Sequence, residues 1–129
     1  MSLAQQLKVM IVDDHRTSRM LTYEALTEIG IKNVVYACDG EEALKLMMST
    51  PCHIVISDFN MPKLDGIQLL RALRSYAPTK KTPFIMLTGK GDRALVQQAA
   101  TFGANNILAK PISAPMLRKT IEAVVGRLQ

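Results

Sequence analysis

The sequence has no tryptophan and only two cysteines, and aromatic residues make up 5% of its 129 positions. Cys38 and Cys52 have no second cysteine at metal-ligand spacing, so we predict two reduced thiols rather than a disulfide or a metal site. The chain also lacks any apolar stretch near the roughly 20 residues that cross a bilayer. Its first eight residues show no cationic segment followed by an apolar one, so no secretory signal is predicted. We therefore expect a cytoplasmic protein that does not enter the membrane.

Charge of one sign is not concentrated anywhere in the chain, although the formal net charge is +5. The basic residues are scattered and no aromatic residues interleave with them, which predicts a solvated surface and no nucleic-acid partner. With 48% hydrophobic and 21% charged residues, the composition is that of an ordinary globular protein. The length suits a single domain over residues 1–129, and we expect that domain to be a monomer.

Five short apolar runs alternate with stretches in which apolar residues recur at helical spacing. Runs of this length are typical of buried strands in a parallel sheet. They occupy residues 9–12, 34–37, 54–57, 84–87 and 106–109. Five successive βα units predict an α/β fold in which a doubly wound parallel sheet is covered by helices on both faces.

The intervening helices are predicted from apolar stripes and from the residues that begin and end helices. The stripes are Leu21, Ala25, Leu26 and Ile29; Ala43, Leu44, Met47 and Met48; Ile67, Leu70 and Leu73; Leu95, Ala99 and Phe102; and Leu117, Ile121, Val124 and Leu128. Gly30 and Gly103 are expected just past two helix ends, and Asp92 and Ser113 as the N-caps of the last two helices. The many methionines fit the core of such a fold as gap fillers.

Five polar residues stand at the trailing ends of four of these runs: Asp13, Asp14, Asp58, Thr88 and Lys110. The carboxyl ends of parallel strands open onto one rim, where ligands bind, so we expect these side chains to converge. Crowded carboxylates stay ionised only beside a positive charge, and all-oxygen ligation is the environment that Mg²⁺ prefers. A carboxylate in such a place can attack phosphorus, while a hydroxyl and an ammonium neutralise the phosphoryl oxygens.

The motifs around these residues are similar to those of one family. They are Val12-Asp13-Asp14, the segment 57–62 followed by Asp65-Gly66, residues 87–89, and Ala109-Lys110-Pro111. With these motifs at this spacing, essentially the whole chain resembles the receiver domain of two-component response regulators, in particular the single-domain chemotaxis receivers. The resemblance implies a flavodoxin-like sheet of strand order 2-1-3-4-5. It also implies two protein partners, a chemotaxis-type histidine kinase and the flagellar motor switch protein or its peptide.

The same resemblance assigns roles to the acidic residues. It implies that Asp58 is the phosphoacceptor, taking phosphate from a histidine of the kinase. Asp14, Asp58 and the backbone carbonyl of Asn60 would ligate Mg²⁺, with Asp13 acting through water. His15 follows the acid pair in the sequence, but we place it on the solvated first turn of a helix rather than in catalysis.

Thr88 and Lys110 would contact the phosphoryl group and would be catalytic together with Asp58. In similar proteins the Lys110–Pro111 peptide bond is cis. Chemotaxis receivers usually carry an aromatic residue three positions before the lysine, and its rotamer follows the movement of the threonine. Here that position is Ile107, which is stiff at χ1 and has no ring to move. An output surface built on Thr88 and Ile107 would therefore differ from the family pattern.

Two positions near the acceptor are predicted to set the lifetime of the phosphorylated state. Asn60 lies two residues after Asp58, and Lys90 lies two residues after Thr88. In similar proteins these positions tune the approach of the hydrolytic water. Asn60 is compatible with fast dephosphorylation, whereas a cation at Lys90 could hold the phosphoryl group or block access. We hypothesise that the phosphorylated form decays within minutes.

The leading interpretation is a signalling switch that catalyses only its own phosphorylation and dephosphorylation. One alternative is a phosphate sink that drains a shared chemotaxis kinase without binding the motor. Another is an Mg²⁺-dependent phosphatase, but such enzymes need a second carboxylate two residues after the nucleophile, where this chain has Asn60. A flavin-binding module would share the sheet topology, yet Asp13 and Asp14 would repel its phosphate.

Overall fold

The computed structural model describes residues 2–89 and 93–128. Within these residues five parallel strands form one sheet in the order β2-β1-β3-β4-β5, as the flavodoxin-like prediction requires. The strands are β1 (Lys8–Val12), β2 (Asn33–Ala37), β3 (Ile54–Asp58), β4 (Phe84–Thr88) and β5 (Asn106–Ala109). The helices are α1 (Leu3–Gln6), α2 (Arg16–Glu28), α3 (Gly40–Ser49), α4 (Gly66–Ser75), α5 (Arg93–Thr101) and α6 (Ala114–Val125), with a 3₁₀ turn η1 (Ala77–Thr79).

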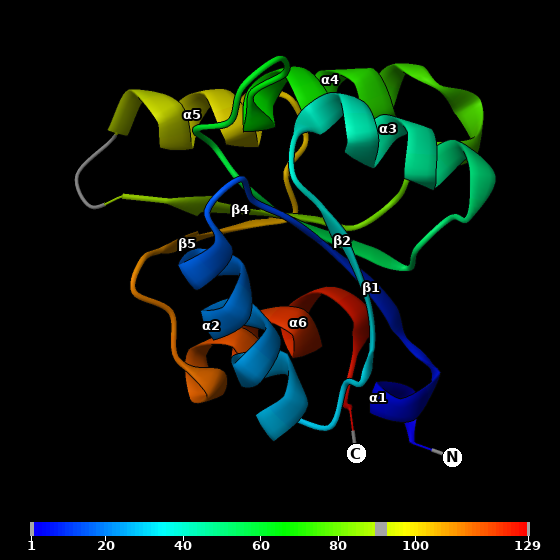
Figure 1. The fold of residues 1–129 in the computed structure, drawn as a ribbon, viewed down its shortest axis with the longest axis vertical. Helices are drawn as coiled ribbons and strands as arrows, with labels where there is room; N and C mark the ends of the chain where they lie inside the picture. Colours follow the sequence, from blue (N-terminus) through cyan, green and yellow to red (C-terminus); the bar gives the residue numbers. More distant parts are fainter. Residues whose placement is uncertain (1, 90–92, 129) are drawn as a thin grey trace.

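Helices cover both faces of the sheet and form two separate cores (Figure 1). Helices α2 and α6 lie on one face with α1, and α3, α4 and α5 lie on the other. Successive strand residues point to opposite faces, so Val9 and Ile11 of β1 enter the first core while Met10 and Val12 enter the second. Because the central strands β1, β3 and β4 are buried on both faces, they are nearly continuous apolar runs, which is why the sequence reveals them so clearly.

Short polar side chains begin the helices that follow the rim. The Asp65 side chain accepts from the backbone N–H of Gln68, and the Gln68 side chain accepts in return from the N–H of Asp65. This reciprocal cap fixes the start of α4 directly after the loop that follows Asp58. Ser113 caps α6 as predicted, while Asp92 lies outside the described residues.

Several residues of the predicted apolar stripes do not lie in the core. Leu21 is 55% exposed and Met48 is 58% exposed, because neighbours along the same helices, Leu26 and Met47, take the core-facing positions. The prediction that methionines fill the core holds for Met10, Met47 and Met86, whereas Met20 and Met116 are exposed, like Met48.

The predicted last helix is too long, and two short elements were not predicted. Leu128 lies beyond the end of α6, which is broken at Gly126 with φ of 100°. Its side chain still packs fully buried in the first core, so the apolar residue identified a buried position but not a helical one. Helix α1 has four residues and the turn η1 has three. Both were missed because so few residues cannot show a periodic apolar pattern.

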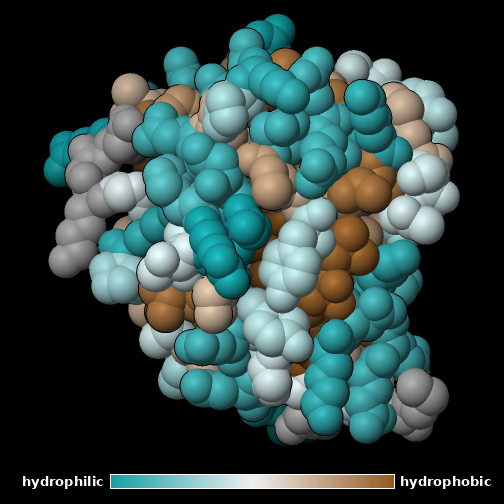
Figure 2. Space-filling view, viewed as in Figure 1, coloured by the Kyte–Doolittle hydropathy of each residue, from teal (hydrophilic) through white to brown (hydrophobic). Residues whose placement is uncertain are grey.

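The β2 edge of the sheet is only partly covered. Figure 2 shows an apolar band along the face on which β2 lies in Figure 1. Val34 and Val35 are half-buried there, and the exposed Tyr36 packs its ring against Tyr23 of α2 at a centroid distance of 5.9 Å.

Among the described helices, none is long and apolar enough to pass through a membrane.

Candidate functional site

The five predicted site residues all lie at the carboxyl end of the sheet. Asp13 and Asp14 directly follow β1, Asp58 and Thr88 are the last residues of β3 and β4, and Lys110 directly follows β5. The strands are parallel and nearly in register, with Asp58 opposite Leu87 and Thr88 opposite Ala109. Parallel pairing therefore brings residues as distant in sequence as 13 and 110 to one place.

Lys110 joins the two buried acidic residues. Its ammonium lies 3.3 Å from Asp13 Oδ2 and 3.3 Å from Asp58 Oδ1. It also donates a hydrogen bond of 2.8 Å to Ser18 Oγ on the first turn of α2. The side chain of Asp13 is 1% exposed and that of Asp58 is 10% exposed. A positive charge between them offsets the cost of holding two carboxylates together out of water.

Burial raises the pKa of Asp58 above its ordinary range. The nearby Lys110 ammonium lowers this pKa and the Asp13 carboxylate raises it, and a hydrogen bond of 2.9 Å from the Phe59 backbone N–H also favours the ionised form. The balance leaves Asp58 easier to protonate than a free aspartate. Such a perturbed carboxyl group in a rim of charged residues is typical of a functional site.

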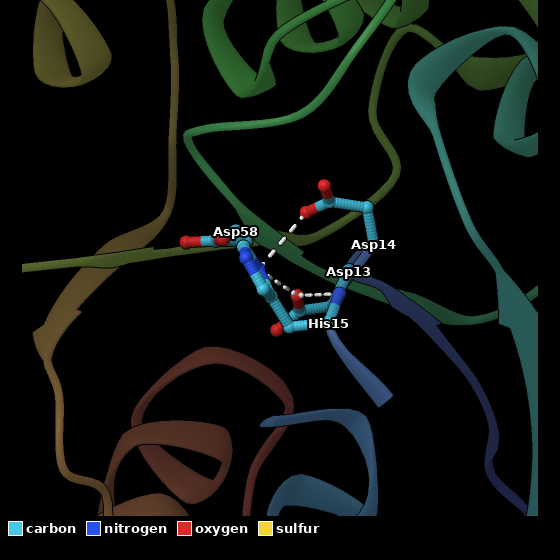
Figure 3. A group of neighbouring side chains, drawn as sticks. All are labelled: Asp13, Asp14, His15 and Asp58. Atoms are coloured by element: carbon cyan, nitrogen blue, oxygen red, sulfur yellow. Dashed lines mark hydrogen bonds and ion pairs between the residues drawn. The ribbon is translucent and has the colours of Figure 1, made fainter. Parts of the chain in front are cut away.

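Asp13, Asp14, His15 and Asp58 form one group whose possible ligand atoms lie within 4.8 Å of one another (Figure 3). The His15 Nδ1 atom is 3.1 Å from Asp14 Oδ1 and 3.6 Å from Asp13 Oδ1. The His15 backbone N–H donates to Asp13 Oδ1 at 2.9 Å. Asp14 is the most accessible of the three acids, with a side chain 31% exposed. Three carboxylates that converge in this way can hold a divalent cation.

The contact of His15 with the acids was missed from the sequence. The residue was expected on a solvated turn, and its side chain is indeed 67% exposed at the N-cap position of α2. Its ring nevertheless turns back toward Asp14. Ser18 was also missed, because its contact with Lys110 depends on how α2 packs on β1 and α6 and leaves no mark in the local sequence. The only available signal was the position of both residues just after the acid pair.

Four other predicted residues, Thr88, Asn60, Ile107 and Lys90, lie at different places relative to this group of acids. Thr88 is buried, and its backbone carbonyl accepts from the Lys110 N–H at 2.7 Å. Asn60 lies exposed in the loop after β3, and Ile107 is half-buried on β5 against the second core. Lys90 lies outside the described residues. The peptide bond after Lys110 is cis, as the resemblance implied.

The arrangement of these acids, the hydroxyl and the ammonium at one end of a 2-1-3-4-5 sheet matches a known family over most of the chain. Residues 9–122 match the response regulator receiver domain. The chain belongs to that family.

Relatives of this receiver domain are chemotaxis proteins. It is 55% identical to a probable chemotaxis protein CheY of Rhizobium etli, and the match covers all of both chains. It is also similar to the chemotaxis protein CheY4 of Vibrio cholerae, with a TM-score of 0.84 and 34% identity over 92% of this chain and 98% of the other. This receiver is therefore of the CheY type, a class of signalling proteins rather than conventional enzymes.

A third similar structure shares the fold at lower identity. It is the receiver domain of a sensor histidine kinase from Pseudomonas aeruginosa, solved with a magnesium ion coordinated in its active-site cleft. The TM-score is 0.84 and the identity is 22%, over 93% of this chain and 98% of the other. At that identity the likeness concerns the fold alone.

The loop after β3 of this receiver is held by close backbone packing. A Cβ placed on Gly66 would fall 2.7 Å from the Asp58 carbonyl oxygen and 3.0 Å from Phe59 Cα. The Gly66 N–H donates to the Phe59 carbonyl at 2.8 Å, which closes the loop at its two ends. Only glycine leaves room for this approach, so α4 can begin directly against Phe59, the residue that follows Asp58.

The Lys63 ammonium pairs the middle of the same loop with acidic side chains of α3 and its N-cap. Lys63 has a φ of 68°, in the region that non-glycine residues rarely occupy. Its ammonium lies 3.7 Å from Asp39 Oδ2 and 3.8 Å from Glu41 Oε2 at the start of α3. An exposed pair of this length contributes little stability, but it joins the loop to the neighbouring βα unit.

Proposed function

We propose that this chain is a stand-alone response regulator that accepts a phosphoryl group on Asp58 and signals by phosphorylation-dependent binding to another protein. The observation that carries the proposal is the position of Asp58. It ends β3, it is nearly buried, and it is in contact with Lys110 within a group of acids. A buried carboxylate with a mobile cation beside it suits the gain of a doubly charged group.

The donor set of the rim fits Mg²⁺. Asp13, Asp14 and Asp58 offer carboxylate oxygens that lie close together, and we assign Asp14, Asp58 and the Asn60 carbonyl as ligands, with Asp13 acting through water. When bound, the ion would neutralise negative charge on the transferring phosphoryl group. A receiver domain of the same fold, that of the Pseudomonas sensor kinase, holds a magnesium ion in its active-site cleft.

The chain's own residues supply the rest of the transfer. An Asp58 oxygen attacks phosphorus as a P–O bond forms, and the P–N bond to the kinase histidine breaks with its electron pair returning to the imidazole. Lys110 follows the new negative charge from the carboxylate to the phosphoryl oxygens, and the Thr88 hydroxyl donates to one of them. The group is later lost by hydrolysis, in which water attacks the phosphorus, the P–O bond to Asp58 breaks and inorganic phosphate leaves. Asn60 and Lys90 set the rate of this step, with decay over minutes.

The partners we propose are a chemotaxis-type histidine kinase as donor and the flagellar motor switch as target. The chemotaxis relatives support both. A new charge at Asp58 would draw Lys110 and Thr88 inward. Because Thr88 pairs with Ala109 of β5, that movement would reach the surface formed by α5, β5 and α6.

A phosphate sink is the second candidate function, and Ile107 favours it. The residue is half-buried on β5 and packs against the second core. It is stiff at χ1, so it cannot swing between an exposed and a buried pose as an aromatic side chain would. The chemistry at Asp58 would then be intact while the readout to the motor is lost.

The first experiment tests the chemistry. Purified protein is incubated with Mg²⁺ and a small-molecule phosphodonor, and intact-mass spectrometry measures the added phosphoryl group. We expect one group per chain, none in Asp58→Asn, and none when a chelator removes the metal. Phosphorylation of Asp58→Asn to the wild-type level would contradict the assignment of the acceptor.

The second experiment separates the switch from the sink. Binding of a motor-switch peptide is measured with and without Mg²⁺ and beryllofluoride, a phosphoryl mimic, with Asp58→Asn as the control. Tighter binding on activation, lost in the mutant, supports a motor-directed switch. If the mimic binds at Asp58 while the peptide affinity stays unchanged, the sink becomes the better description.

A further inference from the structure

Lys110 has three N–H donors, and three side-chain oxygens lie close to its ammonium, those of Asp13 and Ser18 as hydrogen-bond acceptors and that of Asp58 as an ion-pair partner. Two are the carboxylate oxygens of Asp13 and Asp58, each at 3.3 Å. The third is the hydroxyl oxygen of Ser18, which at 2.8 Å is the nearest of the three. The shortest hydrogen bond of the ammonium is therefore made to a neutral side chain outside the group of acids.

The backbone around Ser18 is held firmly in relation to the acids. The Arg19 guanidinium donates to the backbone carbonyl of Asp13 at 2.9 Å, which ties the first turn of α2 to the end of β1. The Thr22 hydroxyl donates to the Ser18 carbonyl at 3.1 Å. Ser18 is thus a fixed anchor, whereas the ammonium that it holds sits on a flexible four-carbon stem.

The Ser18–Lys110 contact lies at the wall of a cavity of about 480 Å³. The cavity is lined mostly by apolar groups, including Leu21, Leu87 and Ile112. The Lys110 side chain is 30% exposed, so without the hydroxyl it has room to turn away from the carboxylates. Charge alone draws it toward Asp13 and Asp58 but does not select one position between them.

We propose that Ser18 is a positioning residue for Lys110, one that holds the ammonium ready to meet the incoming phosphoryl group on Asp58. This inference rests on the proposed phosphorylation of Asp58. The hydroxyl adds no charge, so it fixes the ammonium without competing with the phosphoryl oxygens as a carboxylate would. When the group arrives, Lys110 gives up a neutral partner for a charged one, and that exchange is favourable.

The test combines two measurements on the intact protein. The first is the rate of Asp58 phosphorylation by a small phosphodonor at saturating Mg²⁺, followed by intact-mass spectrometry. The second is hydrogen exchange of the Lys110 ammonium in metal-free protein, followed by nitrogen-detected NMR and assigned with Lys110→Arg. If Ser18 had a purely structural role, its substitution would change neither the exchange of the Lys110 ammonium nor the phosphorylation rate of fully folded protein.

We expect Ser18→Ala to slow phosphorylation roughly three- to tenfold, the effect of losing one hydrogen bond of ordinary net strength, and to speed the ammonium exchange. Ser18→Thr keeps the hydroxyl and should restore most of both. Thr17→Ala removes the neighbouring hydroxyl, which is exposed and lines the same cavity, and should change neither. In a Lys110→Ala background the Ser18 substitution should have no further effect on the rate.

Two results would overturn the inference while leaving the proposed function intact. One is a wild-type phosphorylation rate in Ser18→Ala. The other is a loss that persists undiminished in the Lys110→Ala background, because Ser18 would then act through another group. If the wild-type protein itself takes no phosphoryl group, the proposed function fails. The ammonium exchange still tests the inference in that case, because an unchanged exchange rate in Ser18→Ala would show that the hydroxyl does not hold Lys110.

Discussion

Gly40 lies so close to Leu64 that no side chain fits between them. A Cβ built on Gly40, the first residue of α3, would fall 2.5 Å from Leu64 Cβ and 2.8 Å from the Leu64 carbonyl oxygen. Leu64 belongs to the loop between β3 and α4. The start of α3 is therefore packed directly against the loop that follows β3.

Gly40→Ala is expected to push this loop away from α3. The clash involves backbone as well as side-chain atoms, so it should destabilise the protein by about 1–3 kcal/mol, as overpacking does. Urea unfolding would measure the loss. Gly89→Ala is the matched control, because a Cβ there meets nothing within 4 Å. Equal stability of the two variants would show that the loop yields without cost.

Removing the charge of Asp58 is expected to stabilise the metal-free protein at neutral pH. Burial raises the pKa of Asp58 in the folded state, so the unfolded chain ionises at lower pH than the folded one. Between the ordinary aspartate pKa of about 3.9 and the raised value, stability falls as pH rises, and the full cost remains above that window.

Thermal unfolding of wild type and Asp58→Asn, both with a chelator, would measure this cost across pH. The mutant should melt higher at neutral pH, and the difference should disappear as the pH falls below the ordinary aspartate range. Added Mg²⁺ should stabilise the wild type more than the mutant. A wild type that is more stable than Asp58→Asn at neutral pH would show that the ion pair with Lys110 outweighs burial.

Asp14→Asn is expected to weaken Mg²⁺ binding by at least about tenfold, since it replaces a charged ligand by a neutral one in a hard-cation site. Titration followed by NMR or calorimetry would measure the change. Glu24→Gln removes an exposed carboxylate from the middle of α2 and should leave the affinity unchanged. If both variants bind Mg²⁺ as the wild type does, Asp14 is not a ligand.

Two leucines of α2 should differ sharply when they are shortened. Leu26 is fully buried in the first core, so Leu26→Ala should cost about 3 kcal/mol through lost contacts and a cavity. Leu21 is 55% exposed, so Leu21→Ala should change the free energy of unfolding by no more than about 0.5 kcal/mol. Denaturant unfolding would compare the two, and similar losses would contradict the packing of α2.

The predicted strands agree with the structure to within one residue at each end. The three central strands, β1, β3 and β4, are buried between helices on both faces, so nearly every position in them had to be apolar. The helices were harder to predict, because an apolar stripe tells which residues can be buried but not which ones a neighbour covers. Leu21 and Met48 show this, since each lies in a correct helix with its side chain in solvent.

For this protein the sequence alone determined the order of strands and helices, the family, and the candidate residues at the strand ends. Those features depend on local patterns or short motifs, so they can be recognised in the amino-acid sequence itself. Only the tertiary structure showed that Lys110 lies between Asp13 and Asp58, that His15 turns toward Asp14, and that Ser18 holds the ammonium. These contacts join residues that parallel pairing and helix packing bring together, and no local pattern records distances of a few ångströms between them.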